Sequence, residues 1–314
     1  MIEKTFTKDI LKGLSATPKY LQSKYFYDTK GDLLFQRIMQ SEEYYLTDAD
    51  MEIFEEQSDT ISNVLSEQSD YFDVVELGAG DATKSTHLLK ALVRAKKDFN
   101  YYPIDISENI IEQLETEIPK RVPSVTVIGL AGEYLPMLEE LNRMTSKKKV
   151  VLFLGSSIGN FESKSASLFL NALNNHLNKG DRLLIGFDLK KNPHQILAAY
   201  NDKEGITRDF NLNLLQRIND TANGDFDLDS FEHYPTYDPL TGTCKSYLIS
   251  KIKQQVSVDG QPINFENNEP IYMEMSQKYS ESDIEQLARD AGFETEHLFY
   301  DSNKWYCNAL WKKI

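Results

Sequence analysis

Short apolar runs alternate with amphipathic stretches through the central part of this chain. Five runs are typical of buried strands, and the stretches between them repeat apolar residues at helical spacing. The strands are predicted at residues 74–78, 101–105, 125–131, 150–157 and 182–189, and the helices at residues 87–92, at 108–117, through Leu138 and through Leu173. The uninterrupted apolar run at residues 150–154 favours a central parallel strand covered on both faces. This order of elements predicts a doubly wound α/β sheet.

The pattern changes after Asp188. A long helical region is predicted through Asn219, then an acidic loop at residues 225–231 and alternating strands near 245–253 and 271–279. The last part of the chain returns to the earlier pattern, with a helix at residues 282–291 and two strands at 293–301 and 305–311. We therefore expect a second lobe after Asp188 and a C-terminal hairpin that closes the first sheet.

The segment VVELGAGDATKST, residues 74–86, predicts a strand, a glycine turn and a helix N-terminus. Gly78 and Gly80 stand where a Cβ would block a ligand or strain the backbone, and the helix offers unpaired N–H groups. Asp105 ends the next predicted strand, where an acidic side chain binds ribose hydroxyls in such folds. A buried carboxylate is costly, so we expect Glu76 at the end of its strand. These features predict a site for an adenosine-containing cofactor.

The glycine pattern alone leaves the cofactor open. Gly80 is followed by Asp81, and the third glycine of the dinucleotide fingerprint is missing, so the turn is more similar to that of S-adenosylmethionine sites. A tight turn without any ligand is the plain structural alternative. A nicotinamide-dependent oxidoreductase is disfavoured by the missing glycine, and a non-catalytic binding protein remains a third class.

Composition narrows the class of partner. With 314 residues and 40% hydrophobic content, the chain is long enough for one large domain or two smaller ones. The formal net charge of −15 argues against a nucleic-acid partner and is compatible with a cationic or zwitterionic small substrate. The basic triple at residues 147–149 is expected to be a solvated loop.

Cysteine and histidine usage gives no metal site. Cys244 and Cys307 form no CxxC pair, and the five histidines lack the spacing of metal ligands. The N-terminal sequence has no apolar core of a signal peptide, and no apolar run is long enough to cross a membrane. We expect a cytoplasmic protein without a membrane partner. Its oligomeric state is left open, and a monomer is compatible with the sequence.

Several long motifs resemble one known family. They are GLSATPKYLQSKYFYDTKGDLLFQRIMQSEEYYLTDAD, VVELGAGDATKST, YYPIDIS, FLGSSIGNF, LLIGFDLKK, AYNDKEGITRDFNLNLL, FDLDSFEH and MEMSQKY. The family is the S-adenosylmethionine-dependent histidine-specific methyltransferases of ergothioneine biosynthesis, which trimethylate the α-amino group of L-histidine. The resemblance implies a Rossmann-like class I methyltransferase domain at residues 50–188 and 279–314. It also implies a second α+β lobe, at residues 1–49 and 189–278, that binds the substrate.

The resemblance assigns roles to particular residues. Cofactor binding falls to Gly78, Gly80, Lys84 and Asp105, with Glu133 and Tyr134 at the adenine in place of the family's Asp and Phe. Catalytic roles fall to Asn160 and Tyr27. The amino acid is implied to be surrounded by Tyr27, Tyr44, Asn160, Tyr200, Ser246, Glu274 and Ser276. Within this set, Asn160 and Tyr200 grip its carboxylate, and Glu274 and Ser276 face its side chain.

The residues themselves support part of this assignment. Strand alternation places Tyr272, Glu274 and Ser276 on one face, so Glu274 and Ser276 could touch the same ligand. A solvated sheet face is the plain alternative there. Methyl transfer from a sulfonium to a neutral amine requires alignment and exclusion of water more than a dedicated base. A carboxylate such as Glu274 suits the N–H of an azole ring.

Two departures from the family pattern keep the substrate open. Ser157 replaces a common Thr, and Ser246 replaces a Met that packs against the substrate ring. Histidine is the expected substrate. Another amino acid of the tryptophan type, or a histidine ring nitrogen as acceptor, is the alternative.

Overall fold

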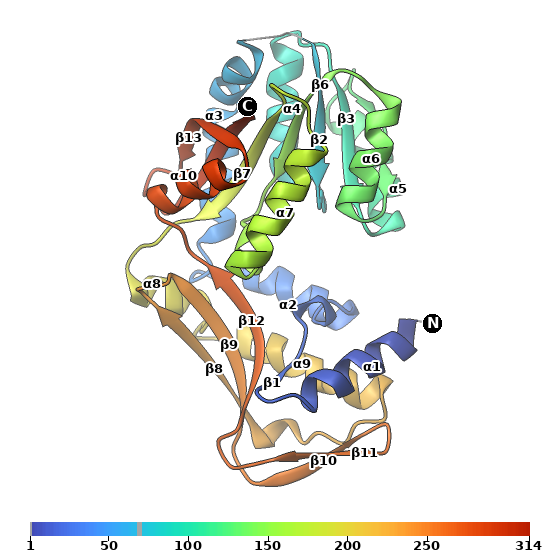
Figure 1. The fold of residues 1–314 in the computed structure, drawn as a ribbon, viewed down its shortest axis with the longest axis vertical. Coiled ribbons are helices and arrows are strands. Elements are labelled where there is room, and N and C mark those ends of the chain that lie inside the picture. Colours follow the sequence, from blue (N-terminus) through green and yellow to red (C-terminus); the bar gives the residue numbers. More distant parts are fainter. Residues whose placement is uncertain (1, 68–70) are drawn as a thin grey trace. The chain divides into compact units, whose positions relative to one another are not determined.

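The computed structural model describes residues 2–67 and 71–314 of the chain. It divides into two compact units (Figure 1): the first is Met1–Tyr45 and Lys190–Gln277, and the second is Leu46–Leu189 and Lys278–Ile314. Residues 46–49, Leu189 and Lys278, placed in the substrate lobe from sequence, belong to the second unit. Residues 46–49 begin its long helix α3. Among the described residues, no helix is both long and apolar enough to cross a membrane.

The second unit is built on an eight-stranded sheet in the order β13-β14-β7-β6-β2-β3-β4, with β5 also paired to β3. The strands from β7 to β4 are parallel, and β14 runs antiparallel to both β7 and β13. The strand bounds are β2 Phe72–Leu77, β3 Asn100–Asp105, β4 Thr126–Val127, β5 Leu130–Ala131, β6 Lys148–Phe153, β7 Arg182–Asp188, β13 Phe293–Tyr300 and β14 Tyr306–Lys313. The predicted doubly wound α/β fold with a closing hairpin is confirmed.

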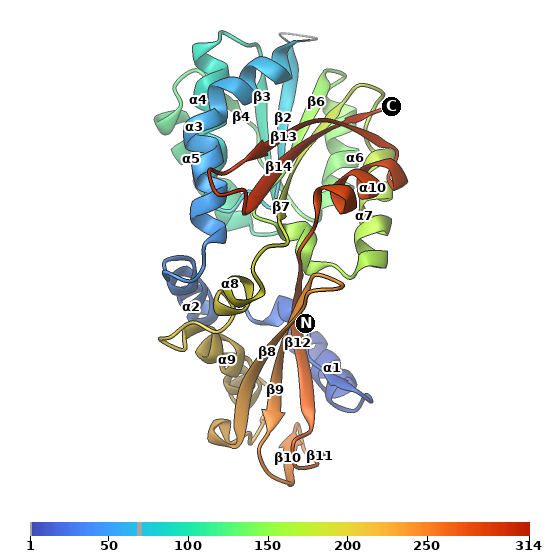
Figure 2. The same ribbon diagram turned by 90° about the vertical axis from the view of Figure 1, so that its left-hand side faces the viewer.

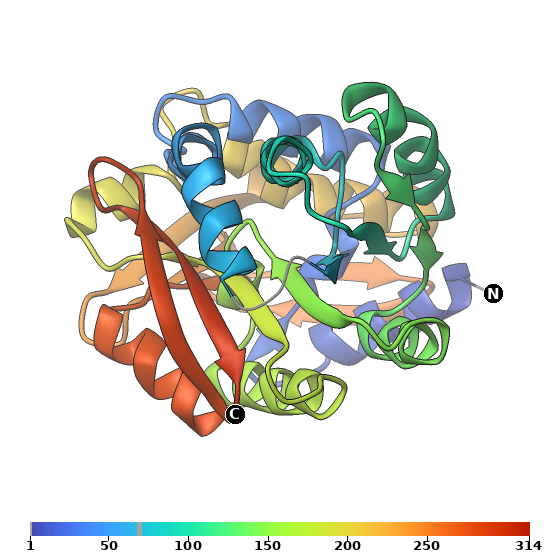
Figure 3. The ribbon, with the colours of Figure 1, turned by 90° about the horizontal axis from the view of Figure 1, so that it is seen from above.

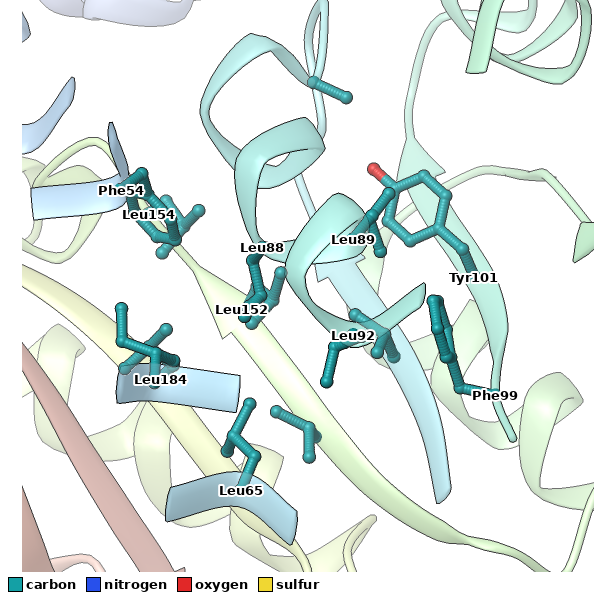
Figure 4. Packing of buried hydrophobic residues seen from close by; sticks show 14 of the residues in the cluster. Phe54, Leu65, Leu88, Leu89, Leu92, Phe99, Tyr101, Leu152, Leu154 and Leu184 are labelled. Carbon is teal, nitrogen blue, oxygen red and sulfur yellow. The ribbon is translucent and has the colours of Figure 1, made fainter. Parts of the chain in front are cut away.

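Helices cover both faces of this sheet. They are α3 Leu46–Ser66, α4 Thr83–Arg94 and α5 Glu108–Arg121 on one face, and α6 Tyr134–Met144, α7 Ser163–Asn175 and α10 Glu281–Asp290 on the other. Seen from above in Figure 3, α3 and α4 in blue and teal lie on the opposite side of the strands from α7 in yellow-green. Figure 4 shows Leu88 and Leu92 of α4 packed near Leu152 of β6. Adjacent residues of β2, Val74 and Val75, join the opposite cores, as expected for a strand buried on both faces.

Two local expectations for this unit are wrong. The strand predicted at residues 125–131 is interrupted between β4 and β5 at Gly129, where a Cβ would lie only 2.3 Å from the Ile111 side chain of α5. The basic triple is not a solvated loop, because Lys148 and Lys149 begin β6 and Lys149 is 1% exposed.

The first unit combines a four-stranded sheet, β1-β12-β9-β8, with a separate hairpin of β10 and β11, drawn in orange in Figure 2. Its strands are β1 Lys19–Tyr20, β8 Phe231–Asp238, β9 Thr243–Ser250, β10 Gln254–Val258, β11 Gln261–Phe265 and β12 Pro270–Gln277. Its helices are α1 Ile2–Leu14, α2 Thr29–Met39, α8 Pro193–Ala198 and α9 Ile206–Thr221, with 3₁₀ turns at Ser23–Tyr25 and Leu228–Ser230. A core of its own holds these elements together, and it includes Phe210 and Leu214 of α9 and Leu248 of β9.

The sequence pattern describes this unit less completely than the second. The helical region predicted through Asn219 is broken between α8 and α9, where Gly205 takes a left-handed φ of +72°. Strand β8 and the β10–β11 hairpin were not predicted. A bulge between Tyr272 and Glu274 also shifts the register of β12 against β9, so Tyr272 lies opposite Tyr247 but Glu274 lies opposite Ser246.

Candidate active-site residues

The glycine turn after β2 has the geometry that a ligand turn requires. Gly78 and Gly80 have φ values of +70° and +52°. A Cβ on Gly78 would lie 2.7 Å from the hydroxyl of Tyr134, whereas a Cβ on Gly80 would meet nothing within 4 Å. The turn is therefore tightly packed at Gly78 and open at Gly80, directly before helix α4.

Asp105 lies beside this turn at the end of β3. One carboxylate oxygen accepts a hydrogen bond from the Ser107 N–H at 3.0 Å, and the other is 3.4 Å from the Gly80 N–H. The structure thus brings together the two sequence features from which an adenosine site was predicted. Ile106, the next residue, is 76% exposed, an uncommon state for isoleucine. Sequence reasoning did not select Ile106, although an apolar residue directly after the acid predicted to bind ribose is a usable signal.

Glu133 and Tyr134 follow the neighbouring strand β5, whose Ala131 pairs with Asp105. Glu133 is the N-cap of α6, and Tyr134 is its first residue. Burial raises the pKa of Tyr134, and the charge of Asp105 raises it further. A neutral phenol hydroxyl therefore borders both Gly78 and Asp105.

Glu76 differs from its predicted place. It lies within β2 rather than at its end and is 4% exposed. The hydroxyl of Tyr101 on β3 donates to its carboxylate, which offsets part of the desolvation cost. Burial raises the pKa of Glu76 to about 7, while hydrogen bonds from Ser85 and Tyr101 oppose the shift.

Lys84 and Asn160 lie at the same edge of the sheet, where the parallel strands end. Lys84 is in the first turn of α4, and its ammonium pairs with Asp50 of α3 at 2.6 Å. Asn160 ends the 3₁₀ turn Ser157–Asn160 after β6, and its side chain is exposed. The predicted residues of the second unit therefore cluster along the carboxyl ends of β2, β3, β5 and β6, the usual ligand edge of such sheets.

In the first unit, the predicted tyrosines belong to one aromatic group. Tyr27 contacts Phe35 and Phe210, with ring centroids 5.6 and 5.8 Å apart. Tyr44 contacts Phe35 at 6.4 Å and Tyr200 at 6.5 Å. Tyr27 is 48% exposed, yet burial raises the pKa of its phenol, and the charges of Glu274 and Asp32 add to the shift.

The polar residues predicted to bind the substrate share the inner face of the sheet. Glu274 lies opposite Ser246, and Ser276 lies opposite Cys244, so all three point the same way. Ser246 is 1% exposed, and its hydroxyl has no hydrogen-bond partner within the described residues. The expectation that Tyr272 shares this face is wrong, because the bulge turns it outward against Tyr247.

The remaining candidates for chemistry are a buried histidine and any group of side chains that could bind a metal. His233, on the inner face of β8, is 8% exposed, and burial lowers its pKa to about 4. Within residues 2–67 and 71–314, no group of three or more His, Cys, Asp or Glu side chains could hold a metal ion. The chemistry available is thus that of an open glycine turn, acidic and phenolic groups, and an aromatic group bordered by a carboxylate.

Comparison with known proteins gives these groups a context. The family model described as histidine-specific methyltransferase, SAM-dependent, matches residues 6–313. A histidine N-alpha-methyltransferase of Mycobacterium tuberculosis is 32% identical, covering 87% of this chain and 84% of that protein. A histidine N-alpha-methyltransferase of Mycolicibacterium smegmatis is 30% identical, covering 94% and 90%. A 4-dimethylallyltryptophan N-methyltransferase of Claviceps fusiformis is 27% identical, covering 94% and 88%.

Proposed function

Because this chain belongs to the family of S-adenosylmethionine-dependent histidine-specific methyltransferases, we propose that it methylates the α-amino group of L-histidine. The family match over residues 6–313 is the observation that carries the proposal. Two relatives are named histidine N-alpha-methyltransferases. They are 32% and 30% identical to this chain over 87% and 94% of its length. Addition of three methyl groups, to the trimethyl betaine, is included in the proposal.

The residues of the second unit fit the cofactor. S-adenosylmethionine supplies an electrophilic methyl group on sulfur. The open, left-handed Gly80 allows close approach of a ligand, Asp105 offers carboxylate oxygens to ribose hydroxyls, and the exposed Ile106 offers apolar surface to an adenine ring. We assign Gly78, Gly80, Lys84, Asp105, Glu133 and Tyr134 to the cofactor, with Ile106 added from its exposure.

Substrate binding is assigned to the residues that the resemblance implies. Asn160 and Tyr200 are proposed to hold the α-carboxylate, with Tyr27 and Tyr44 around the amino acid. Glu274 and Ser276 are proposed to face the ring, because their side chains share the inner face and the charge of Glu274 reaches Tyr27. A carboxylate that accepts an azole N–H favours side chains that carry such a donor over side chains that lack one.

The chain needs little acid–base chemistry for this reaction. A peptide α-amino group has a reference pKa of about 8, and the ionised carboxylate of a free amino acid makes its amine more basic, so a minor fraction is neutral near pH 7. The raised pKa of Tyr27 keeps its phenol protonated, so the hydroxyl orients a partner rather than removing a proton. Asn160 and Tyr27 are therefore proposed to act by alignment of the amine.

A tryptophan-type amino acid is the second candidate substrate. The observation in its favour is Ser246, a small residue opposite Glu274 where the resembled family has Met. The 4-dimethylallyltryptophan N-methyltransferase among the relatives is more distant, at 27% identity. A histidine ring nitrogen as acceptor is a further variant of the proposal.

Cellular context is also a proposal. Action on a free amino acid in the cytoplasm, without a nucleic-acid partner, is consistent with a net charge of −15, which repels phosphate backbones. The oligomeric state is left open.

The experiment is product analysis by mass spectrometry. The enzyme is incubated with S-adenosylmethionine and a panel containing histidine, tryptophan and the two ring N-methylhistidines. We expect histidine mass to rise by one to three methyl groups, and fragmentation to place them on the α-amine. Asp105→Ala is the matched control, with cofactor binding weaker by about 1.5–3 kcal/mol. Methylation of tryptophan alone, or of the ring, would replace the leading candidate.

A further inference from the structure

Asp50 is a buried carboxylate of α3 on which three hydrogen bonds converge. It is 1% exposed. One oxygen accepts from the Lys84 ammonium at 2.6 Å and from the Gly155 N–H at 3.2 Å, and the other accepts from the Asn308 amide at 2.8 Å. A buried carboxylate is strongly destabilising unless such partners compensate it, so these bonds determine its orientation. One side chain thereby joins α3, α4, the turn after β6, and β14.

The ammonium of Lys84 lies between two functional turns. Lys84 is the second residue of α4, four residues after Gly80, and its Nζ is 3.3 Å from where a Cβ on Gly155 would lie. The Lys84 side chain as a whole retains 27% exposure, while its ammonium is held by Asp50. A long lysine side chain loses substantial rotamer freedom when it is fixed in one place.

The bond to Gly155 affects the turn that carries Asn160. Gly155 and Ser156 both have left-handed φ values, +70° and +56°. The Ser156 hydroxyl accepts from the Asp188 N–H at 3.2 Å, and its carbonyl accepts from Gly159 N–H at 2.8 Å. Asp50 therefore fixes the first residue of a turn whose last residue is Asn160.

We propose that Asp50 is a positioning residue for the cofactor, acting through Lys84 and the Gly155 turn. The inference rests on the proposed function, in which Lys84 contacts the cofactor. The anionic group of the cofactor is the carboxylate of its methionyl part, which an ammonium pairs with directly. Asp50 orders that ammonium before the cofactor binds, so less rotamer freedom is lost on binding.

A double-mutant cycle on cofactor affinity tests this role. S-adenosylhomocysteine is titrated by calorimetry into the wild type, Asp50→Asn, Lys84→Met and the double variant. Asparagine keeps the volume and one acceptor oxygen of Asp50 but removes the ion pair. We expect each single variant to raise Kd about tenfold. The double variant is expected to be no weaker than the worse single one, since both changes remove one shared interaction.

Asp181→Asn is the matched control. Asp181 is 0% exposed and accepts from the N–H groups of Lys149 and Asn178, at the start of β7 rather than at its ligand edge. It should lower the melting temperature without changing Kd. If Asp50→Asn does not fold, Asp50→Ser, which removes the ion pair and leaves a small polar side chain, enters the same cycle.

The outcomes separate two failures. A Kd within about twofold of wild type in Asp50→Asn, beside a tenfold loss in Lys84→Met, overturns the role of Asp50 alone. The role of Asp50 is also overturned if the increases in Kd of the two single variants multiply in the double variant, as independent effects do. An unchanged Kd in Lys84→Met overturns the cofactor assignment of Lys84, and the role of Asp50 with it.

Discussion

Glu274 and Ser246 face each other across β12 and β9, where the apolar inner face of the first unit gives way to polar side chains. A buried hydroxyl without a partner costs about 1–3 kcal/mol, and a carboxylate left unpaired by a ligand costs more. If the pair faces the substrate as proposed, we expect it to distinguish substrate side chains by their hydrogen-bonding groups as well as their size.

Glu274→Ala should reduce histidine use selectively. Loss of a charge-assisted hydrogen bond to the ring N–H is expected to lower kcat/KM for histidine, equivalent to about 2–4 kcal/mol of transition-state stabilisation. The kcat/KM for tryptophan should rise relative to that for histidine, because space opens beside the ring. Ser246→Met is the matched variant, because it restores the residue of the resembled family and should raise the preference for histidine. The ratio of kcat/KM values for the two amino acids is measured. A ratio unchanged by Glu274→Ala would show that selectivity lies elsewhere.

His233 should make the stability of the first unit depend on pH. Burial lowers its pKa to about 4, with Asp202 opposing and Arg208 reinforcing the shift, against a reference of 6.5. As pH falls below 6.5, His233 becomes protonated in the unfolded chain before it does in the folded protein. The free energy of unfolding therefore decreases between pH 6.5 and pH 4. The full loss is about 3 kcal/mol. His233→Leu should remove it.

Chemical denaturation at pH 7 and pH 5, followed by far-UV circular dichroism, measures the part of this loss that falls above pH 5, about 2 kcal/mol. Tryptophan fluorescence would report only the second unit, where Trp305 and Trp311 lie. The pKa of Glu76 is raised to about 7 in the folded protein, so protonation of Glu76 increases the free energy of unfolding as pH falls through this range. Wild type and His233→Leu are therefore compared at each pH. Equal pH dependence in both proteins would contradict the prediction.

Individual residues differ in how visible their roles are in sequence. Gly78, Gly80 and Asp105 have local signals, a turn after a strand and an acid at the next strand end. Asp50 has none, because its three partners come from distant parts of the chain.

At the level of elements, continuous apolar runs were sufficient to predict the buried parallel strands, because each such strand needs apolar residues on both faces. Strand β8 was missed because its alternation includes His233 on the buried side and Pro235 in its middle. The bulge in β12 was not predictable from alternation, since the extra residue is defined only by the pairing with β9.

The turn after β6 should be required for turnover rather than for folding. Asn160 is exposed at its end, so Asn160→Ala is expected to change stability by no more than about 0.5 kcal/mol. Loss of its proposed hydrogen bonds to the amino acid should lower kcat/KM, equivalent to a loss of about 1.5–3 kcal/mol of transition-state stabilisation. Asn171→Ala, an exposed asparagine of α7, is the control for a general effect of the substitution. A melting temperature that falls together with activity would make Asn160 structural.

At the scale of the whole molecule, each unit has its own hydrophobic core, and the chain passes between them more than once. The break in pattern after Asp188 was visible in sequence, but the start of the second unit at Leu46 was not. The reason is that the amphipathic helix α3 gives no sign of which core its apolar face joins.

The division into two units predicts which part of the protein S-adenosylhomocysteine, the product formed from the cofactor, stabilises. S-adenosylhomocysteine at a concentration of 100 times Kd stabilises the folded state by about 2.7 kcal/mol if it binds that state alone. We expect hydrogen exchange to slow in the second unit, at residues 78–81, 105–107 and 132–134, where the glycine turn, Asp105 and Tyr134 meet. The β10–β11 hairpin of the first unit serves as the internal reference, and Asp105→Ala should weaken the protection at equal ligand concentration. Protection confined to the first unit would contradict the cofactor assignment, because none of the residues proposed to bind the cofactor belongs to it.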